Sequence, residues 1–324
     1  MHRFESGRRL SCFSGLIPHS AIAGIVHMKP RHRSTDSQTF QFQKYSHHSV
    51  AMNGKTIALL TDFGWKDGYT GIMKAVILSI APGLPIIDLS HDIDPQNLYS
   101  GAYVLYSAWD HFPNGSTFCA VVDPGVGGDR GALLAEITGR TLIAPDNGLI
   151  SVVLRMNPNS PVFELREEEV RSRRAGALAR AGMSSTFHGR DLFAPAAALC
   201  ALGAKEQIRG RRIEPVFLPA VIPRRGDHGI SGAILHIDRF GNCISSIHQN
   251  DLDILRDTAG GVSIRAGEFQ RREIDRTYSD VHPGTALCLI GSSGFLEIAV
   301  CRGNAAERFG LCAGQTVTIT AGDA

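Results

Sequence analysis

The stretch that decides the fold is residues 56–83, "TIALLTDFGWKDGYTGIMKAVILSIAPG". It begins with a continuous apolar run that ends in polar residues and a glycine, which is typical of a buried parallel strand leading into a loop. Residues 69–83 then have the apolar spacing of a helix and stop at Pro82 and Gly83. A buried strand followed directly by a helix indicates an α/β protein.

The same alternation of strands and helices continues along the chain. We expect strands within 84–91 and 116–127, a hairpin within 131–148, and helices within 97–115 and 192–204. This order predicts a Rossmann-like sheet whose faces are covered by helices.

The character of the sequence changes near residue 223. Pro219, Pro223 and the charged run 224–229 are typical of a linker. Beyond it, apolar and polar residues alternate between Gly-rich turns in three segments, 229–248, 285–300 and 314–320. A fourth segment, 304–311, has helical spacing. The sequence therefore predicts a smaller, mainly β domain of barrel or sandwich type.

We divide the chain into an extension (1–51), an α/β catalytic domain (52–222) and a β domain (223–324). The extension is rich in His, Ser and Arg and has weak periodicity. Its apolar stretch at 15–28 follows a basic head, but Pro18 and His19 interrupt it, so it makes a poor signal peptide. We expect a disordered segment, or translation upstream of a true start at Met52.

Composition and charge narrow the class of protein. Of the 324 residues, 43% are hydrophobic and 20% charged, which is ordinary for a globular protein. The net charge is +2, but residues 1–51 carry +5 and the remainder −3. A mildly acidic body argues against a nucleic-acid groove or an anionic membrane surface as a partner. No apolar run approaches the length of a membrane span.

The cysteines show no pattern. There are seven, without a C-x-x-C pair and without Cys/His zinc spacing. An odd, unpatterned number favours a reducing compartment, so we expect the protein in the cytoplasm and expect no structural metal.

Carboxylates stand near the ends of three expected strands, where a parallel sheet binds its ligands. These are Asp62, Asp88 and Asp123. Each alone is also explained as a turn or helix-capping residue. Asp62 and Asp123, however, fall at corresponding ends of strands expected to be neighbours, which favours a site. The glycines at 125–128 let the backbone turn sharply before Arg130.

A second cluster is "SSTFHGRDLFAPAA" at 184–197, where His188, Arg190 and Asp191 stand within four residues. One interpretation is a loop whose charges pair with each other. The other is an acid/base site, because a histidine beside a carboxylate and a guanidinium is a usual arrangement for proton transfer.

The β domain offers two polar, Gly-rich loops, at 236–247 and 291–307. They could be ordinary β-turns. They could also bind a nucleoside, since Phe240 offers a ring for stacking a base and Asn242 has the donor and acceptor that read adenine.

Together these motifs closely resemble the S-adenosylmethionine (SAM) hydroxide adenosyltransferase family of SAM hydrolases, relatives of the SAM-dependent fluorinases and chlorinases. The resemblance rests on "TDFGWKDGYTGIMKA", "DPGVGGDR", "STFHGRDLFAPAA", "IDRFGN" and "SSGFLEIAVCRGNAA" and spans about residues 56–320. It implies a Rossmann-like domain, a C-terminal β-barrel and a homotrimer. It further implies active sites between the N-terminal domain of one subunit and the C-terminal domain of the next.

The resemblance also implies residue roles. The catalytic triad is Asp123, Arg130 and His188. Asp62 matches the carboxylate that binds the ribose diol. The other substrate-binding positions are Asp67 and Asp238 near the methionine, Phe240 and Asn242 at the adenine, and Ser293, Glu297, Asn304 and Ala305 in the remaining loops.

The chemistry that follows is an in-line attack of water at ribose C5′, which gives adenosine and L-methionine. SAM is the substrate, and the reaction needs no metal or cofactor. Asp123, oriented by Arg130, would accept a hydrogen bond from the water, and His188 would complete the water's hydrogen bonds and relay the proton. Asp62 would hold C5′ in place through the ribose.

Three alternatives stay open at this point. A SAM-dependent halogenase needs a small desolvated halide pocket, and the intact triad argues against it. A non-catalytic SAM or adenosine sensor predicts binding without turnover. A metal-dependent phosphoesterase predicts loss of activity with a chelator, and the sequence has no ligand pattern for one.

Overall fold

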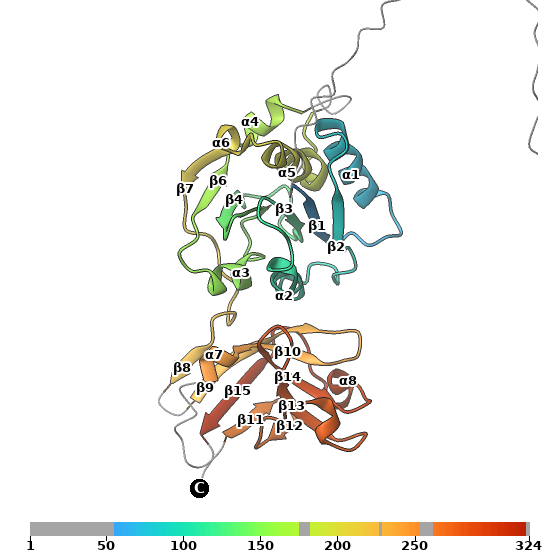
Figure 1. Ribbon diagram of the computed structural model, residues 1–324, viewed down its shortest axis with the longest axis vertical. Helices are drawn as coiled ribbons and strands as arrows, with labels where there is room; N and C mark the ends of the chain where they lie inside the picture. The colour runs from blue at the N-terminus through green and yellow to red at the C-terminus, as the bar shows by residue number, and fades with distance from the viewer. Residues whose placement is uncertain (1–54, 175–181, 227–228, 253–261, 322–324) are drawn as a thin grey trace, which may run out of the picture. The chain divides into compact units, whose positions relative to one another are not determined.

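Two β-sheets organise the protein (Figure 1). The structure is a computed structural model that describes residues 55–174, 182–226, 229–252 and 262–321. Both sheets belong to one unit, residues 49–324. The expected extension and Met52 lie outside the described residues.

The first sheet has seven strands in the order β2-β1-β3-β5-β4-β6-β7. Strands β2, β1, β3 and β5 run parallel, and β4, β6 and β7 add antiparallel neighbours. The strands are β1 (Ile57–Thr61), β2 (Ile86–Ser90), β3 (Thr117–Val121), β4 (Ala132–Ile137), β5 (Arg140–Pro145), β6 (Val162–Leu165) and β7 (Arg209–Arg212). The helical elements are α1 (Tyr69–Ile80), α2 (Leu98–Trp109), α3 (Ser151–Met156), α4 (Glu167–Ser172), the π-helical turn η2 (Gly189–Phe193), α5 (Ala194–Ala201) and α6 (Lys205–Ile208).

Strand β1 is buried on both faces, as its apolar run predicts. Alternate side chains point to opposite faces of the sheet. Ile57 and Leu59 join the core beneath α1 and α5, whereas Ala58 and Leu60 join the core beneath α2 and α3. In Figure 1 these two pairs of helices cover the two faces of the sheet, so the expected Rossmann-like architecture is confirmed.

The expected hairpin is β4–β5. Its two turn residues, Thr138 and Gly139, have φ of 45° and 78°, and this left-handed pair matches the twist of the flanking strands.

The second sheet has eight strands and forms a nearly closed barrel. Seven follow the order β12-β11-β15-β9-β10-β14-β13, and β8 pairs with β9. The two ends of this order approach each other, because Asp275, just after β12, bridges to Leu289 of β13. The strands are β8 (Arg224–Gly226), β9 (Gly229–Ile237), β10 (Cys243–His248), β11 (Val262–Ala266), β12 (Phe269–Arg271), β13 (Ala286–Ile290), β14 (Phe295–Val300) and β15 (Thr316–Ala321); short helices are α7 (Gln249–Leu252), η4 (Tyr278–Asp280) and α8 (Ala305–Phe309).

Part of the expected linker was wrong. Residues 224–226 form strand β8, because their backbone groups pair with the start of β9. The short elements β6, β7, α3, α4 and α6 were also absent from the sequence-based expectation, since segments of four to six residues carry too little periodicity to identify.

Helices α2 and α3 pack against the barrel strands β9, β10 and β14. Ser100 Oγ lies 2.9 Å from His236 Nδ1, and the Tyr103 ring stacks on the His236 ring with centroids 5.1 Å apart. Arg155 of α3 donates to the carbonyls of Val221 and Ser246 and to the carboxylate of Asp251. This contact therefore combines stacking, an ion pair and an apolar core.

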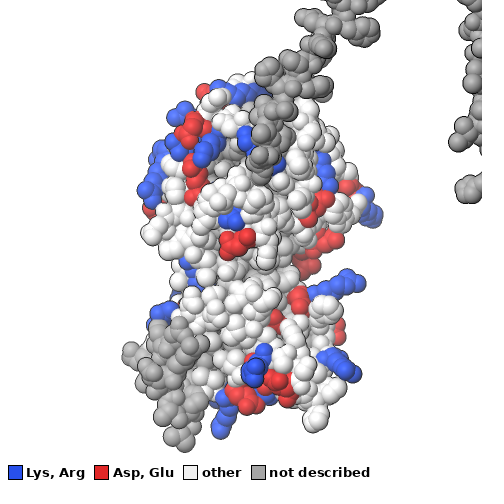
Figure 2. All heavy atoms as spheres, viewed as in Figure 1, with Lys and Arg blue, Asp and Glu red and all other residues white. Residues whose placement is uncertain are grey.

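Charges of both signs interleave on the face drawn in Figure 2. Among the ion pairs of the protein, Lys205 and Arg209 contact Glu136 of β4 at 2.9 and 3.0 Å. Across the part of the chain that the structure describes, no helix is long and apolar enough to cross a membrane.

Candidate active site

The carboxyl ends of β1 and β3 place Asp62 and Asp123 at one edge of the sheet. The two strands pair in parallel with Thr61 opposite Val121, so the residues that follow them emerge side by side. Both carboxylates line one cleft of about 630 Å³. The expectation that these two residues share an edge is confirmed by the strand pairing.

Asp62 is held by a strained piece of backbone. Its Oδ2 accepts a hydrogen bond from the backbone N–H of Gln96 at 2.9 Å. Gln96 has φ of 66°, a left-handed conformation that costs a non-glycine residue about 1–3 kcal/mol. This conformation directs the backbone N–H of Gln96 at Oδ2 of Asp62. Oδ1 of the same carboxylate is left available to a ligand.

The "DPGVGGDR" turn brings Arg130 back onto Asp123. Nε of Arg130 lies 3.0 and 3.1 Å from the two carboxylate oxygens, and Nη2 lies 2.5 Å from Oδ2. The side chains are only 10% and 5% exposed. Such a two-pronged, charge-assisted pair fixes the orientation of the carboxylate far better than a single contact does.

Gly127 lets this turn approach the loop that carries His188. Its φ is 78°, and a Cβ there would stand 2.3 Å from the carbonyl oxygen of Ser185. Only glycine therefore fits, since both the conformation and the space exclude a side chain.

His188 completes the group. Its Nδ1 lies 2.8 Å from Nη2 of Arg130, so one guanidinium contacts both the aspartate and the histidine. Burial, and then the positive charge of Arg130, lower the pKa of His188. The structure thus brings Asp123, Arg130 and His188 together from positions 65 residues apart in the sequence.

Arg190 and Asp191, the other charged residues of the 184–197 cluster, stabilise the loop that carries His188. The Asp191 side chain, fully buried, accepts from the Ser184 backbone N–H at 2.7 Å and from Arg190 at 2.7 and 2.8 Å. The expectation that the charges of this loop pair with each other is therefore correct for Arg190 and Asp191, while His188 turns to Arg130. Residues 189–193 form a π-helical turn, a feature frequent at functional sites.

Asp67, expected near the methionine, is exposed in the loop that precedes α1. It is not among the residues that line the cleft. Phe63, Tyr69 and Phe187 contact one another edge to face, with centroids 5.2–5.9 Å apart, and all three line the cleft.

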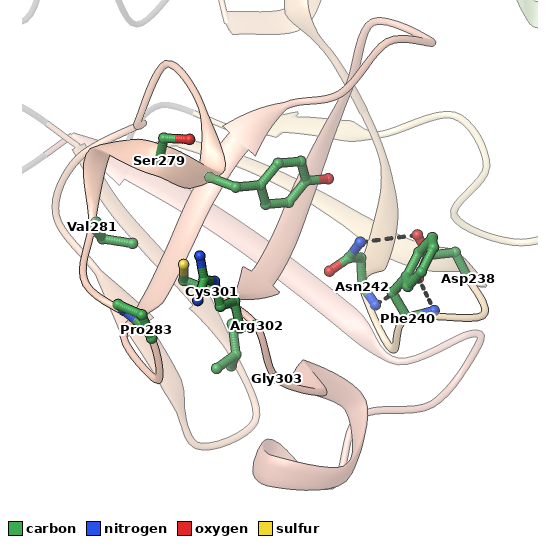
Figure 3. Close-up of a pocket in the computed structure, with 11 residues that line it drawn as sticks. Asp238, Phe240, Asn242, Ser279, Val281, Pro283, Cys301, Arg302 and Gly303 are labelled. Carbon is green, nitrogen blue, oxygen red and sulfur yellow. Dashed lines mark hydrogen bonds between the residues drawn. The ribbon is translucent and has the colours of Figure 1, made fainter.

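The β domain presents its own cavity, of about 780 Å³, around the "IDRFGN" turn (Figure 3). Asp238 closes this turn by accepting from the backbone N–H groups of Phe240 and Asn242, each at 2.9 Å. The Asn242 amide nitrogen donates to the other Asp238 oxygen at 2.9 Å. Phe240 is 75% exposed, so its ring stands free of the chain's own core.

Ser293 and Glu297 have partners within the chain. The Ser293 hydroxyl lies 3.1 Å from the Tyr103 hydroxyl, and the Tyr278 hydroxyl donates to Glu297. Burial raises the pKa of Glu297, and the charge of Asp238 acts in the same direction. Glu297 and Asp238 line a smaller cavity of about 380 Å³ beside the first.

Asn304 and Ala305 support the turn from behind. The Asn304 side chain caps α8 by accepting from the Glu307 N–H at 3.0 Å, and the buried Ala305 donates its N–H to the carbonyl of Gly241 at 3.1 Å. A Cβ on Gly241 would collide with the Asn304 side chain. These two residues thus hold the Asp238–Asn242 turn in shape.

The expected site residues therefore form two groups. In the α/β part, Asp62 and Asp123 line the cleft, and Arg130 contacts both Asp123 and His188. In the β domain, Asp238, Phe240 and Asn242 line the first cavity and Glu297 lines the smaller one. Sequence reasoning missed Gln96 and Tyr278, whose contacts depend on backbone strain and on a turn that bears no motif. Among the described residues, no three His, Cys, Asp or Glu side chains are grouped to hold a metal ion.

Comparison with known proteins follows the same division of the chain. The SAM hydroxide adenosyltransferase N-terminal domain matches residues 57–209, and the C-terminal domain of the same family matches residues 232–318. An (R)-S-adenosyl-L-methionine hydrolase of Thermus thermophilus is 40% identical, over 82% of this chain and 99% of that protein. A fluorinase of Nocardia brasiliensis is 26% identical, over 82% and 97%.

Solved structures agree with these matches. An uncharacterized conserved protein from Thermotoga maritima superimposes with a TM-score of 0.70 at 33% identity, covering 82% of this chain and 100% of that one. The two domain matches together span most of the chain. The chain belongs to the SAM hydroxide adenosyltransferase family.

Proposed function

We propose that this protein hydrolyses SAM to adenosine and L-methionine, with water attacking ribose C5′. Family membership supports the substrate. The single observation that carries the proposal is the contact of one guanidinium, that of Arg130, with both Asp123 and His188 at a cleft that also holds Asp62.

The reaction needs alignment more than basicity, because the leaving sulfur of a sulfonium departs neutral. The water oxygen forms the new bond to C5′, the C5′–S bond breaks, and sulfur keeps the electron pair. One water proton must be lost. Asp123 accepts it, since a carboxylate has acceptor positions beyond those that Arg130 occupies, and passes it to solvent.

His188 positions the water in this proposal and, unlike in the expectation from the sequence, does not relay the proton. A guanidinium only donates, so Nδ1 of a neutral His188 must accept and Nε2 must carry the proton. Nε2–H then donates to the water oxygen while the water donates to Asp123. The nucleophile is thereby held between two fixed groups, and such alignment supplies several kcal/mol of the barrier.

Asp62 binds the ribose in the proposed complex. Gln96 engages Oδ2, so Oδ1 remains for the 2′- and 3′-hydroxyls. The aromatic walls formed by Phe63, Tyr69 and Phe187 would face the sulfonium and its methyl group, to which aromatic faces are attractive.

The β domain would bind the adenine of a neighbouring subunit's substrate. The Asn242 amide nitrogen is engaged by Asp238, which leaves its oxygen to accept from the adenine amino group. Phe240 is exposed enough to stack on the base. We therefore propose a homotrimer in which the cleft of one subunit meets the cavity of the next.

Two further points complete the proposal. The Thermus thermophilus relative is named an (R)-SAM hydrolase, so we propose the (R)-sulfonium epimer as the preferred substrate. The six described cysteines are all free thiols, which supports a cytoplasmic location.

The test is a product analysis. The purified protein is incubated with each SAM epimer, with and without chloride and with and without a chelator. We expect adenosine and methionine in every buffer, faster from the (R) epimer, and none from Asp123→Ala. 5′-Chloroadenosine would identify a halogenase, loss with chelator would identify metal chemistry, and tight binding without any product would identify a sensor.

A further inference from the structure

A chain of hydrogen bonds runs behind Asp62, between β1, α1 and the end of β2. Thr61 Oγ1 lies 2.7 Å from His91 Nδ1, and His91 Nε2 lies 3.0 Å from Asp88 Oδ1. Lys74 donates to the other Asp88 oxygen at 2.6 Å. Thr61 and His91 are fully buried.

The direction of each bond follows from the donors. An ammonium only donates, and Asp88 accepts from both Lys74 and His91. Burial opposes the charge on Asp88, but these two bonds outweigh it and the pKa of Asp88 lies below its usual range. In the tautomer with its proton on Nε2, His91 donates to Asp88 and accepts at Nδ1 from Thr61, whose Oγ1 in turn accepts from the Phe63 N–H at 3.2 Å.

This Thr–His–Asp order is that of a nucleophilic triad, yet Thr61 has no access to a substrate. Its side chain is buried and does not line the cleft. The Trp65 ring covers His91 edge to face at 4.8 Å, and the Lys74 ammonium lies 5.3 Å from the Trp65 ring centre. The Thr61–His91 part of the chain of bonds is therefore enclosed, while Asp88 and Lys74 are half-buried, and the chain acts on structure.

This chain of hydrogen bonds holds the turn that carries Asp62. On one side, the His91 ring orients Thr61 so that Thr61 accepts from Phe63. On the other, the His91 carbonyl accepts from the N–H of Gly64 at 2.7 Å. One residue thus contacts both ends of the 61–64 turn, and Asp62 lies between them.

We propose that His91 is a positioning residue that fixes the Asp62 carboxylate for the two ribose hydroxyls. The inference rests on the proposed function, in which Asp62 binds the ribose. Two hydroxyls on neighbouring carbons are bound at once only if the carboxylate is held at one angle. Without the ring of His91, the Thr61 hydroxyl loses its acceptor, and residue 91 then holds the turn only through its backbone carbonyl.

The test compares two probes, adenosine and 2′,3′-dideoxyadenosine, which lacks both hydroxyls. Calorimetry gives the ratio of their dissociation constants for the wild type and for His91→Ala, His91→Asn and Thr61→Val. We expect His91→Ala to lower the preference for adenosine about tenfold. His91→Asn should restore part of it, because its amide oxygen still accepts from Thr61.

Thr61→Val keeps the shape of the buried side chain and removes only the hydroxyl, so it serves if His91→Ala fails to fold. It should lower the ratio in the same direction. His111→Asn, at an exposed histidine after α2, is the matched control and should leave the ratio unchanged. In an Asp62→Ala background, His91→Ala should have no further effect on the ratio.

The outcomes separate the two proposals. A ratio that stays unchanged in the His91 and Thr61 variants, whether or not both probes bind more weakly, would overturn the positioning role while leaving hydrolysis intact. A wild type that binds both probes equally would instead refute the assignment of Asp62 to the ribose.

Discussion

Nη2 of Arg130 lies 2.8 Å from Nδ1 of His188, and this contact decides which nitrogen of the imidazole carries the proton. Because the guanidinium can only donate hydrogen bonds, a proton on Nδ1 would place two N–H donors opposite each other. The neutral ring with its proton on Nε2 is therefore the favoured form. The same contact turns Nε2–H away from Arg130.

The first prediction concerns the titration of His188. Burial and the charge of Arg130 both lower its pKa. Arg130→Met removes the second cause, so the pKa of His188 should rise toward its usual value. Proton NMR titration measures it, with the His188 resonance identified by its absence in His188→Asn. A lower or unchanged pKa in Arg130→Met would contradict the electrostatic role of this contact.

The lowered pKa of His188 also determines how the free energy of unfolding changes with pH. The unfolded chain takes up a proton on this imidazole near its usual pKa, while folded His188 resists protonation down to a lower pH. The free energy of unfolding should therefore fall as the pH drops through the usual histidine range and below it. His188→Asn should lose this part of the acid sensitivity.

The second prediction separates two carboxylates of one turn. Asp123→Asn keeps the size of the side chain but removes the proton acceptor, so kcat should fall by about 10²–10⁴ with little change in substrate affinity. Asp129→Asn changes an exposed carboxylate six residues along and should leave kcat within about twofold. Single-turnover kinetics with SAM measures both, and equal losses in the two variants would refute a specific role for Asp123.

The third prediction concerns Gly127, where the "DPGVGGDR" turn approaches the loop that carries His188. In Gly127→Ala the new Cβ would overlap the Ser185 carbonyl, so the loop that leads to His188 must move. We expect a loss of about 1–3 kcal/mol in the free energy of unfolding, together with a loss of kcat. Gly71→Ala, in α1 with open space around it, should be neutral or slightly stabilising. Denaturant unfolding and turnover assays check both.

The sequence predicted the parts of this site that depend on strand ends and motifs. The burial of β1 on both faces and the parallel pairing of β1 with β3 follow from apolar runs, and they bring Asp62 beside Asp123. The His91 network could not be predicted, because "IIDLSH" assigns Asp88 to a strand end while the structure places it inside β2. Its partners Lys74 and Thr61 come from other elements, and periodicity carries no signal for such contacts.

The β domain shows the same limit. Its alternating segments predicted β9, β10, β13, β14 and β15, but β11 and β12 were not predicted. A motif also cannot reveal that Asn304 caps α8 while supporting the 238–242 turn. Nor could the charged run at 224–226 be distinguished from a linker, since it becomes a strand only through its pairing with β9.

The fourth prediction concerns the contact between α3 and the barrel. Arg155 is 10% exposed and donates to Asp251 and to two backbone carbonyls, so Arg155→Met removes one buried donor from all three and leaves Asp251 with the His248 N–H and the exposed Arg225. The free energy of unfolding should fall by about 3 kcal/mol. Arg211→Met, which breaks an exposed pair with Glu164, should cost less than about 1 kcal/mol. Similar effects of the two substitutions in denaturant unfolding would show that the buried contact adds nothing.

The last prediction tests whether two subunits share one active site. Asp123→Asn damages only the cleft, and Asn242→Ala damages only the cavity of the β domain. If each site combines the cleft of one subunit with the cavity of the next, an unfolded mixture of the two inactive variants, refolded together at equal amounts, regains intact sites. Random assembly gives about a quarter of the wild-type sites, because an intact cleft and an intact cavity each occur at half of the positions. The readout is adenosine formation from SAM, with each variant refolded alone as the control. A mixture that stays at the level of the separate variants, although mass measurement shows mixed oligomers, would mean that each chain completes its site by itself.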